Sequence, residues 1–199
     1  MTLHTVIFIG RSGSGKGTQA DLLKDRFHRL DSARHILYIE TGARFREFIR
    51  GGSLSAKRAK EINDEGSLQP DFLAAWMWGS ALIEELEPDM HLVFDGAPRA
   101  ESEARLLTTA LGFYGRKNVT VIHIKVSRRW SEDRLLARGR ADDTSLQKVD
   151  KRLDWFDKKV VPAIEYFKSD PFYKVIEVNG EQPIEKVHAD IIAAYEYKK

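Results

Sequence analysis

Short apolar runs alternate along the chain with longer segments whose apolar residues recur at helical spacing. Runs typical of buried strands lie at 5–9, 36–39, 91–94, 119–126 and 173–178. Helical patterns follow each run and end near Leu30, Glu87, Leu111, Arg138, Phe167 and Tyr195. Strands that alternate with helices predict an α/β fold with a five-stranded parallel sheet covered on both faces.

Three local features refine this prediction. Residues 41–66 carry few apolar side chains and contain a Gly51-Gly52 break, which predicts a small flap of short helices against the core. Trp76 and Trp78 are two residues apart on one predicted helix, so we expect one in the core and the other partly exposed. A long helix over 145–167 is expected to be interrupted at Pro162.

Composition narrows the function classes. A length of 199 residues with 42% apolar content fits a single domain, and 32 basic against 30 acidic residues disfavour nucleic-acid binding. There is no cysteine, which excludes disulfides and thiolate zinc sites. The six histidines show no metal-ligand spacing, and no apolar run is long enough for a membrane span. Met1 leads almost directly into the first strand, so we expect no signal peptide and a cytoplasmic protein.

The stretch from Gly10 to Gln19 carries the clearest chemistry. It lies between the first strand and a helix, and glycines at 10, 13, 15 and 17 let backbone N–H groups approach an anion. Lys16 supplies an ammonium for the outer phosphates and Thr18 a hydroxyl for magnesium. Gly-x4-Gly-Lys in this context predicts a nucleoside triphosphate site, although Gly17 rather than Ser or Thr follows the lysine directly.

Other polar motifs follow the second and third predicted strands. Ligands of such sheets bind beyond the carboxyl ends of the strands, where Thr41-Gly42 and the stretch 95–99 should lie. Asp95 is placed to order the water of a magnesium ion, or else to cap the following turn. Five arginines from separate elements should reach the same edge of the sheet: Arg46, Arg99, Arg138, Arg140 and Arg152. There they would neutralise the charge of a phosphoryl group during transfer; the alternative is that they are solvated surface side chains.

Over almost its whole length the chain resembles the adenylate kinase family. The loop Gly10 to Gln19 resembles the family's phosphate loop, with Ser12 where proline is usual, and Asp95-Gly96-Ala97-Pro98-Arg99 resembles its Asp-Gly-Phe-Pro-Arg signature. The resemblance implies an ATP site of Gly13, Ser14, Gly15, Lys16, Gly17, Thr18, Arg134, Arg138 and Gln182. It implies an acceptor site of Thr41, Gly42, Arg46, Gln69, Gly96, Arg99, Glu103, Arg140 and Arg152.

The resemblance also implies an activity and a division of the chain. The fold would be of the P-loop NTPase type, and the protein would be a monomeric kinase that moves the γ-phosphoryl group of ATP to a nucleoside monophosphate with Mg2+. Lys16, Arg99, Arg138, Arg140 and Arg152 would be catalytic, and Thr18 and Asp95 would hold the magnesium ion through water. The core would comprise 1–40, 67–138 and 144–199. The acceptor-binding insert would be 41–66, and a short zinc-free lid 139–143.

Departures from the family cluster around the acceptor base. Ala43 and Arg44 follow Thr-Gly, Gln69 replaces a typical valine, and Ala97 replaces the aromatic residue of the signature. Glu103 stands where the family has a glutamine that reads adenine, and an ionised glutamate does not donate a hydrogen bond. One hypothesis is therefore that Glu103 sets base choice, so that Glu103→Gln raises the preference for AMP over GMP.

Several functions stay open at this stage. AMP is the leading acceptor, and GMP, CMP, UMP and dTMP are alternatives. A reshaped pocket would also suit a kinase for a non-nucleotide acceptor, and a binding module that closes on ATP without turnover is a third class. The many arginines aimed at a transferring phosphate favour catalysis.

Overall fold

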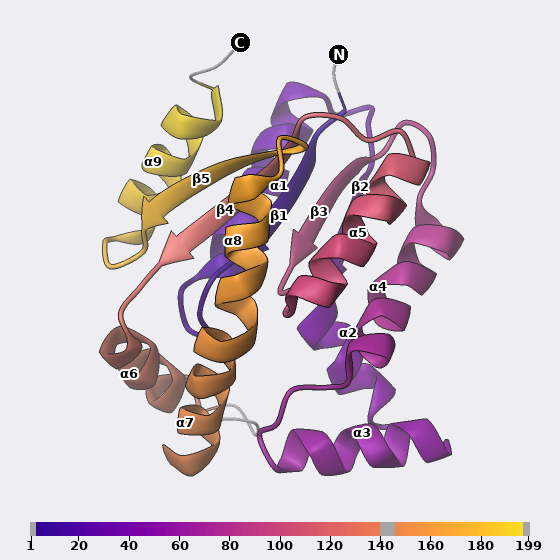
Figure 1. Ribbon diagram of the computed structural model, residues 1–199. Coiled ribbons are helices and arrows are strands. Elements are labelled where there is room, and N and C mark those ends of the chain that lie inside the picture. Colours follow the sequence, from indigo (N-terminus) through magenta and orange to yellow (C-terminus); the bar gives the residue numbers. More distant parts are fainter. Residues whose placement is uncertain (1–2, 140–145, 197–199) are drawn as a thin grey trace.

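A five-stranded sheet forms the centre of the protein in a computed structural model, which describes residues 3–139 and 146–196 (Figure 1). The strands are β1 (Thr5–Ile9), β2 (Ile36–Glu40), β3 (His91–Asp95), β4 (Val119–Lys125) and β5 (Tyr173–Asn179). The helices are α1 (Lys16–Leu30), α2 (Thr41–Phe48), α3 (Leu54–Asp64), α4 (Asp71–Glu85), α5 (Glu101–Phe113), α6 (Arg128–Arg138), α7 (Leu146–Trp155), α8 (Val161–Ser169) and α9 (Ile184–Glu196). The predicted alternation of strands and helices is confirmed.

All strand pairs in the sheet are parallel, and the strand order is β2-β3-β1-β4-β5. The central strand β1 places Ile7 opposite Phe94 of β3 and Val121 of β4. The chain therefore changes direction across the sheet beside β1, and such a switch point leaves a crevice beyond the carboxyl ends of the strands. In Figure 1 these ends point toward α2, α3, α6 and α7, while the start of β1 and the end of α9 lie at the opposite edge.

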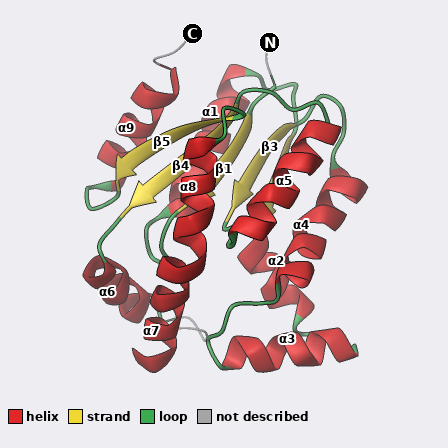
Figure 2. Cartoon of the chain, viewed as in Figure 1, coloured by secondary structure: helices red, strands yellow, loops and turns green. Residues whose placement is uncertain are grey.

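Helices cover both faces of the sheet, as Figure 2 shows. One apolar cluster joins the sheet to α4, α5 and α8, and a second joins it to α1 and α9. Trp78 of α4 lies in the first cluster with 2% of its surface exposed, whereas Trp76 is 52% exposed. The expectation that these two tryptophans face different sides is confirmed.

The long helix after residue 145 is interrupted one turn earlier than the sequence predicts. A π-helical segment, Phe156–Val160, separates α7 from α8, and Pro162 lies in the first turn of α8. A proline within a helix removes one donor, and its ring crowds the carbonyl group four residues before it, here that of Lys158. The wider π turn accommodates this conflict before the proline is reached.

The segment predicted as a flap forms α2 and α3, with the break between them after Phe48. Phe45 of α2 and Ala59 of α3 are buried against Leu73 and Met77 of α4. The apolar contact of this segment is thus made mainly with one helix of the core. Among the described helices, none combines the length and the apolar character that a membrane span requires.

A hydrogen bond between two histidines links the residue before β1 to the start of β3, at the edge far from the carboxyl ends of the strands. The backbone N–H of His4 donates to Nδ1 of His91 (3.0 Å), and the hydroxyl of Tyr195 lies 2.7 Å from Nδ1 of His4. His91 is 2% exposed, and burial is the main cause that lowers its pKa to about 4. Because Nδ1 of His91 accepts a hydrogen bond, this nitrogen carries no proton in the folded protein.

We expect this pair to make the protein less stable in acid. In the unfolded chain His91 binds a proton with a pKa near 6.5, whereas in the folded protein it does so only near pH 4. The unfolded state therefore binds more protons between these values, and the free energy of unfolding should fall by about 2 kcal/mol as the pH drops from 7 to 4. Urea denaturation at several pH values should show that the free energy of unfolding falls less in acid for His91→Gln than for wild type. His28 is on the exposed side of α1, so His28→Gln should behave as wild type. If the free energy of unfolding changed equally with pH in all three proteins, His91 would not be the group responsible.

Candidate functional site

A cavity of about 690 Å³ lies beyond the carboxyl ends of β1, β2 and β3. The start of α1, helix α2, the end of α3 and helices α6 and α7 supply the rest of its wall. Many of the residues singled out in the sequence line this cavity: Gly13, Gly15, Lys16, Gly17, Thr18, Gly42, Arg46, Gln69, Asp95, Gly96, Arg99, Arg134, Arg138 and Arg152. The fold therefore brings together motifs that are up to 139 residues apart in the chain, from Gly13 to Arg152.

The loop between β1 and α1 has the conformation that its glycines allow. Gly10, Gly13 and Gly15 have positive φ angles of 153°, 82° and 89°. At Gly10 a Cβ atom would lie 2.6 Å from the carbonyl oxygen of Ile124, so only glycine fits this close approach to β4. The ammonium of Lys16 donates to the carbonyl oxygens of Gly10 and Arg11, both at 2.9 Å, and thus lies inside the curve of the loop.

The charge of Lys16 is sensitive to its surroundings. Burial lowers the pKa of the ammonium to about 8; nearby Asp95 opposes this shift, and Arg99, Arg138 and Arg152 add to it. The three guanidinium groups destabilise the charged form of Lys16, and a bound anion would stabilise it. The electrostatics of the cavity therefore favour a ligand with several negative charges.

Asp95 and Thr18 supply oxygen atoms to the same cavity. Asp95 ends β3, accepts a hydrogen bond from the Tyr38 hydroxyl (3.1 Å), and has a pKa raised by burial. The sequence leaves open whether Asp95 caps the following turn; in the structure its carboxylate is hydrogen-bonded to Tyr38. A carboxylate and a hydroxyl, with water for the remaining positions, fit the oxygen ligands that Mg2+ prefers. No group of three or more metal-ligating side chains occurs in the described parts of the chain.

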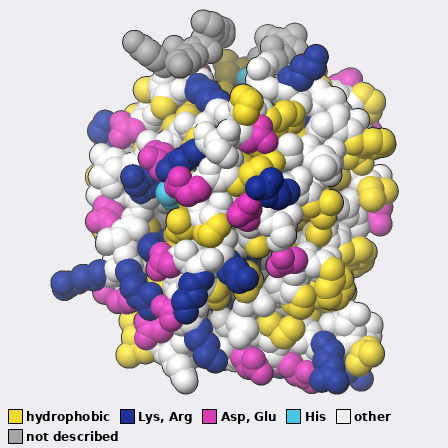
Figure 3. All heavy atoms as spheres, viewed as in Figure 1, with side chains coloured by type: hydrophobic (Ala, Val, Ile, Leu, Met, Phe, Trp, Pro, Cys, Tyr) yellow, Lys and Arg dark blue, Asp and Glu magenta, His cyan; other side chains and the backbone are white. Residues whose placement is uncertain are grey.

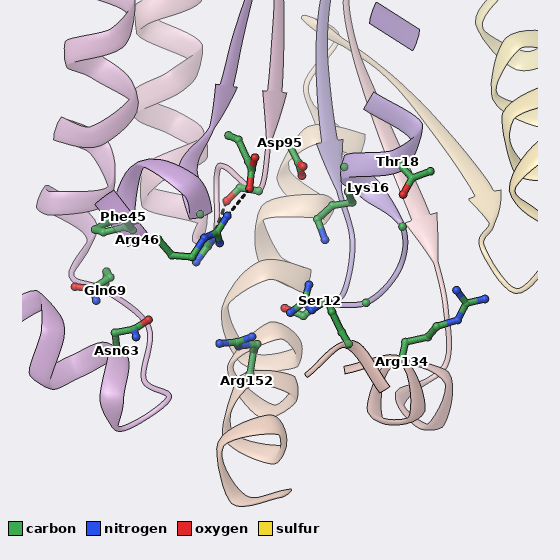
Figure 4. A pocket seen from close by; sticks show the side chains of 18 of the residues that line it. Ser12, Lys16, Thr18, Phe45, Arg46, Asn63, Gln69, Asp95, Arg134 and Arg152 are labelled. Carbon is green, nitrogen blue, oxygen red and sulfur yellow. Dashed lines mark hydrogen bonds and ion pairs between the residues drawn. The ribbon is translucent and has the colours of Figure 1, made fainter. Parts of the chain in front are cut away.

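The arginines at the acceptor side are held in place by neighbours. The guanidinium of Arg99 is half-buried and donates through Nε to the carbonyl oxygen of Gly96 (2.7 Å). Burial is the main cause that lowers its pKa, and Arg152 and Arg46 lower it further. Arg46 donates to Glu40 at 2.8 Å. Figure 4 shows Arg46 and Arg152 reaching toward the same space from different elements.

Ion pairs connect the helices that carry the remaining arginines. Arg128, at the start of α6, pairs with Asp150 (3.0 Å) and Asp154 (2.7 Å) of α7. Arg11 of the phosphate loop pairs with Asp157 and lies 4.7 Å from the ring centroid of Phe156. In Figure 3 basic and acidic side chains are mixed on the face of the molecule that is shown.

A few predicted site residues do not line the cavity. Ser14 and Thr41 are buried, and within the described residues their hydroxyl groups have no hydrogen-bond partner. The amide of Gln182 donates to the carbonyl oxygen of Asn179 and to Asp190, which leaves the predicted ATP contact of Gln182 untested. Arg140 and most of the predicted lid, residues 140–143, lie outside the described residues.

Glu103 is the clearest difference from the arrangement expected for a base reader. Its carboxylate accepts hydrogen bonds from the Trp78 indole N–H (2.8 Å) and from the backbone N–H of Arg99 (2.7 Å). The side chain is buried and is absent from the described lining of the cavity. Burial raises the pKa of Glu103, and the two donors oppose that shift. The carboxylate therefore acts on the loop that carries Arg99.

Four aromatic or amide side chains line the cavity without having been singled out in the sequence. They are Tyr38, Phe45, Asn63 and Trp155. Trp155 follows Arg152 by three residues, and this helical spacing could have placed both on one face. Phe45 and Asn63 both fall in the segment 41–66 predicted as a flap, and nothing in the local sequence distinguishes either of them as a site residue. Arg134 lies over the ring of Trp130, 4.6 Å from its centroid.

Comparisons with known proteins agree with this geometry. The family model described as "Adenylate kinase" matches residues 8–171. An adenylate kinase of Phocaeicola vulgatus is 32% identical over 98% of this chain and 98% of its own length. An adenylate kinase of Corynebacterium urealyticum is 32% identical over 95% of this chain and 97% of its own, and adenylate kinase 1 of Synechocystis is 33% identical over 94% of both.

Proposed function

The chain belongs to the adenylate kinase family and is a phosphotransferase, and from this premise we propose that it transfers the γ-phosphoryl group of ATP to AMP and yields two ADP. The observation that carries the proposal is a group of cations that line one cavity: Lys16, Arg99, Arg138 and Arg152. Arg99, Arg138 and Arg152 lower the pKa of Lys16, so their positive charges lie close to its ammonium. Transfer between two phosphate chains gathers negative charge, which such cations stabilise.

The residues of the cavity divide between the two substrates in this proposal. The phosphate loop and Lys16 hold the phosphates of ATP, while Arg46 and Arg99 hold the acceptor phosphate. An acceptor phosphate oxygen bonds to the γ-phosphorus as the bond from that phosphorus to the β,γ-bridging oxygen breaks. Thr18 and Asp95 would hold Mg2+ through water, and the ion would supply charge neutralisation at the β- and γ-phosphates.

We further propose that α2 and α3 form an acceptor-binding insert at 41–66, and that 139–143 acts as a short lid. Gly139, the first residue of this lid, has a φ of 63° and ends α6, so the chain direction changes there. Closure of the two segments over bound substrates would exclude water from the γ-phosphate. This exclusion would limit hydrolysis of ATP in the absence of an acceptor.

Measured turnover with separate acceptors tests the proposal. The protein is mixed with ATP, Mg2+ and one of AMP, GMP, CMP, UMP or dTMP, and formation of the diphosphate is followed, with Lys16→Ala as the blank. We expect AMP to give the highest kcat/KM. A preference for another monophosphate would correct the acceptor. No turnover with any of them would favour a non-nucleotide acceptor or a binding module.

A further inference from the structure

The phosphate loop is tied to the segment that follows α7. Arg11 is the second residue of this loop, and its Nη2 atom pairs with Oδ1 of Asp157 in the π-helical segment Phe156–Val160. The guanidinium of Arg11 also lies over the ring of Phe156. The pair joins residues that are 146 positions apart in the chain. The side chain of Arg11 therefore connects two segments that the sequence keeps far from each other.

The side chain of Arg11 is held on a rigid support. Phe156 is 5% exposed and belongs to the apolar cluster that joins the sheet to α4, α5 and α8. The Nη1 atom of Arg11 is buried and has no hydrogen-bond partner among the described residues. A buried donor without an acceptor is unfavourable. The side chain keeps this place because its contacts with Asp157 and Phe156 offset that cost.

The backbone of Arg11 shapes the inside of the same loop. Its carbonyl oxygen accepts a hydrogen bond from Nζ of Lys16 at 2.9 Å and another from the backbone N–H of Ser14 at 3.1 Å. A shift of Arg11 would therefore move an atom that holds the ammonium of Lys16. The link from Asp157 to Lys16 has two steps, the ion pair with the side chain of Arg11 and the hydrogen bond to its carbonyl group.

Helix α7 carries charged side chains with two different tasks. Arg152 lines the cavity, whereas Asp150 and Asp154 pair with Arg128 of α6 at 3.0 Å and 2.7 Å. Asp157 extends this acidic row, since its Oδ2 atom is 4.0 Å from Nη1 of Arg128. Side chains on one helix move together when the helix rotates or shifts. A tie at the acidic row thus also fixes the direction in which Arg152 enters the cavity.

We propose that Arg11 and Asp157 are positioning residues for phosphoryl transfer, and that their ion pair holds the phosphate loop and α7 at a fixed separation. The inference rests on the proposed kinase activity. Figure 4 shows Lys16 on the loop and Arg152 on α7 at the same cavity. Arg152 lowers the pKa of Lys16, so the two cations repel each other. This repulsion pushes the loop and the helix apart, and the ion pair outside the cavity lining opposes the separation.

Two substitutions that break the pair provide the test. Arg11→Met keeps an unbranched apolar stem against Phe156, and Asp157→Leu removes the carboxylate. We expect each to lower kcat at saturating ATP and AMP about tenfold, because small displacements of catalytic groups slow the reaction strongly. The KM values of both substrates should stay within about threefold of wild type, since the groups that bind the phosphates are all retained.

The double variant and a conservative variant show whether the effect comes from the pair. Arg11→Met combined with Asp157→Leu should also lose only about tenfold in kcat, because both changes remove the same link. Arg11→Lys keeps a positive charge that can pair with Asp157, so its kcat should stay within about threefold of wild type. Titration calorimetry with ATP in the absence of acceptor counts the competent sites. Expressing kcat per competent site removes the contribution of any unfolded fraction.

Asp154→Leu is the matched control. Asp154 is another carboxylate of α7 with similar exposure, 51% against 43% for Asp157, and it pairs with α6 but not with the phosphate loop. Arg128 keeps Asp150 and Glu132 as partners in this variant. We therefore expect kcat within about twofold of wild type.

The outcomes separate this inference from the proposed function. Wild-type turnover together with kcat values of Arg11→Met and Asp157→Leu close to that of wild type would overturn the positioning role and leave the kinase activity intact. An equal loss in Asp154→Leu, or multiplied losses in the double variant, would also overturn it, because the effect would not then come from this pair. Absence of turnover of wild type with every nucleotide would overturn the proposed function, and the positioning role with it.

Discussion

We expect replacement of Lys16 by Met to lower kcat for phosphoryl transfer roughly 10² to 10³ fold. The ammonium of Lys16 lies inside the curve of the loop and is 2.9 Å from two of its carbonyl oxygens. When ATP enters, the same group can exchange these carbonyl oxygens for phosphate oxygens, whose negative charge it stabilises more strongly. Methionine has similar length and an apolar end, so it removes the charge while it fills most of the space.

The measurement is steady-state turnover at saturating ATP and AMP, with Lys60→Met as the control. Lys60 is exposed on α3 and pairs with Asp64, so its loss should leave kcat unchanged. Retention of more than a tenth of wild-type kcat in Lys16→Met would show that this ammonium contributes little to the transition state.

The pH dependence gives a second readout for the same group. The pKa of Lys16 is about 8 in the free protein, so its charge is lost as the pH rises through 8. We expect kcat/KM for ATP to fall above this pH, and the fall to be absent from the remaining activity of Lys16→Arg, which keeps its charge.

Much of the fold could be predicted because its signals are local. Apolar runs such as Thr5–Ile9 and helical patterns each lie within one stretch of sequence, and all five strands were located from them. The phosphate loop could be predicted equally well, since its glycines, lysine and threonine all lie within the short stretch from Gly10 to Thr18. The π turn at Phe156–Val160 was missed because a helical apolar pattern does not distinguish a wide turn from a regular one.

Contacts between distant segments account for what the sequence did not predict. Glu103 accepts from Trp78, 25 residues away, and the histidine pair joins residues 87 positions apart. The direction of the Gln69 amide depends on one carbonyl group of α3. Residue type suggested a base reader at 103, and the histidines showed only a lack of metal-ligand spacing, whereas the partners supplied by the fold decide what each side chain does.

Glu103 accepts a hydrogen bond from the backbone of Arg99, so we expect it to affect activity by positioning Arg99. Substitution of Arg99 itself is expected to cause the second large loss of activity. Arg99→Lys should lower kcat/KM for the acceptor roughly 10² fold. The planar guanidinium donates through Nε to the carbonyl oxygen of Gly96. Its Nη2 atom lies beside Gly42 and Gly96, since a Cβ atom on these glycines would be 3.7 Å and 3.4 Å from it. A lysine keeps the charge, but it lacks the fixed fork that makes two parallel bonds to a phosphate.

Separate titration of the two substrates locates the defect. The KM for AMP should rise in Arg99→Lys, while the affinity for ATP, measured in the absence of acceptor, should stay within about threefold of wild type. Arg105→Lys is the matched control, because Arg105 lies on α5 and pairs with Glu101 outside the cavity. A loss confined to ATP affinity would place Arg99 at the donor phosphates. Equal losses for both substrates would indicate that the guanidinium contacts the phosphoryl group in transit, together with its neighbours Arg46 and Arg152.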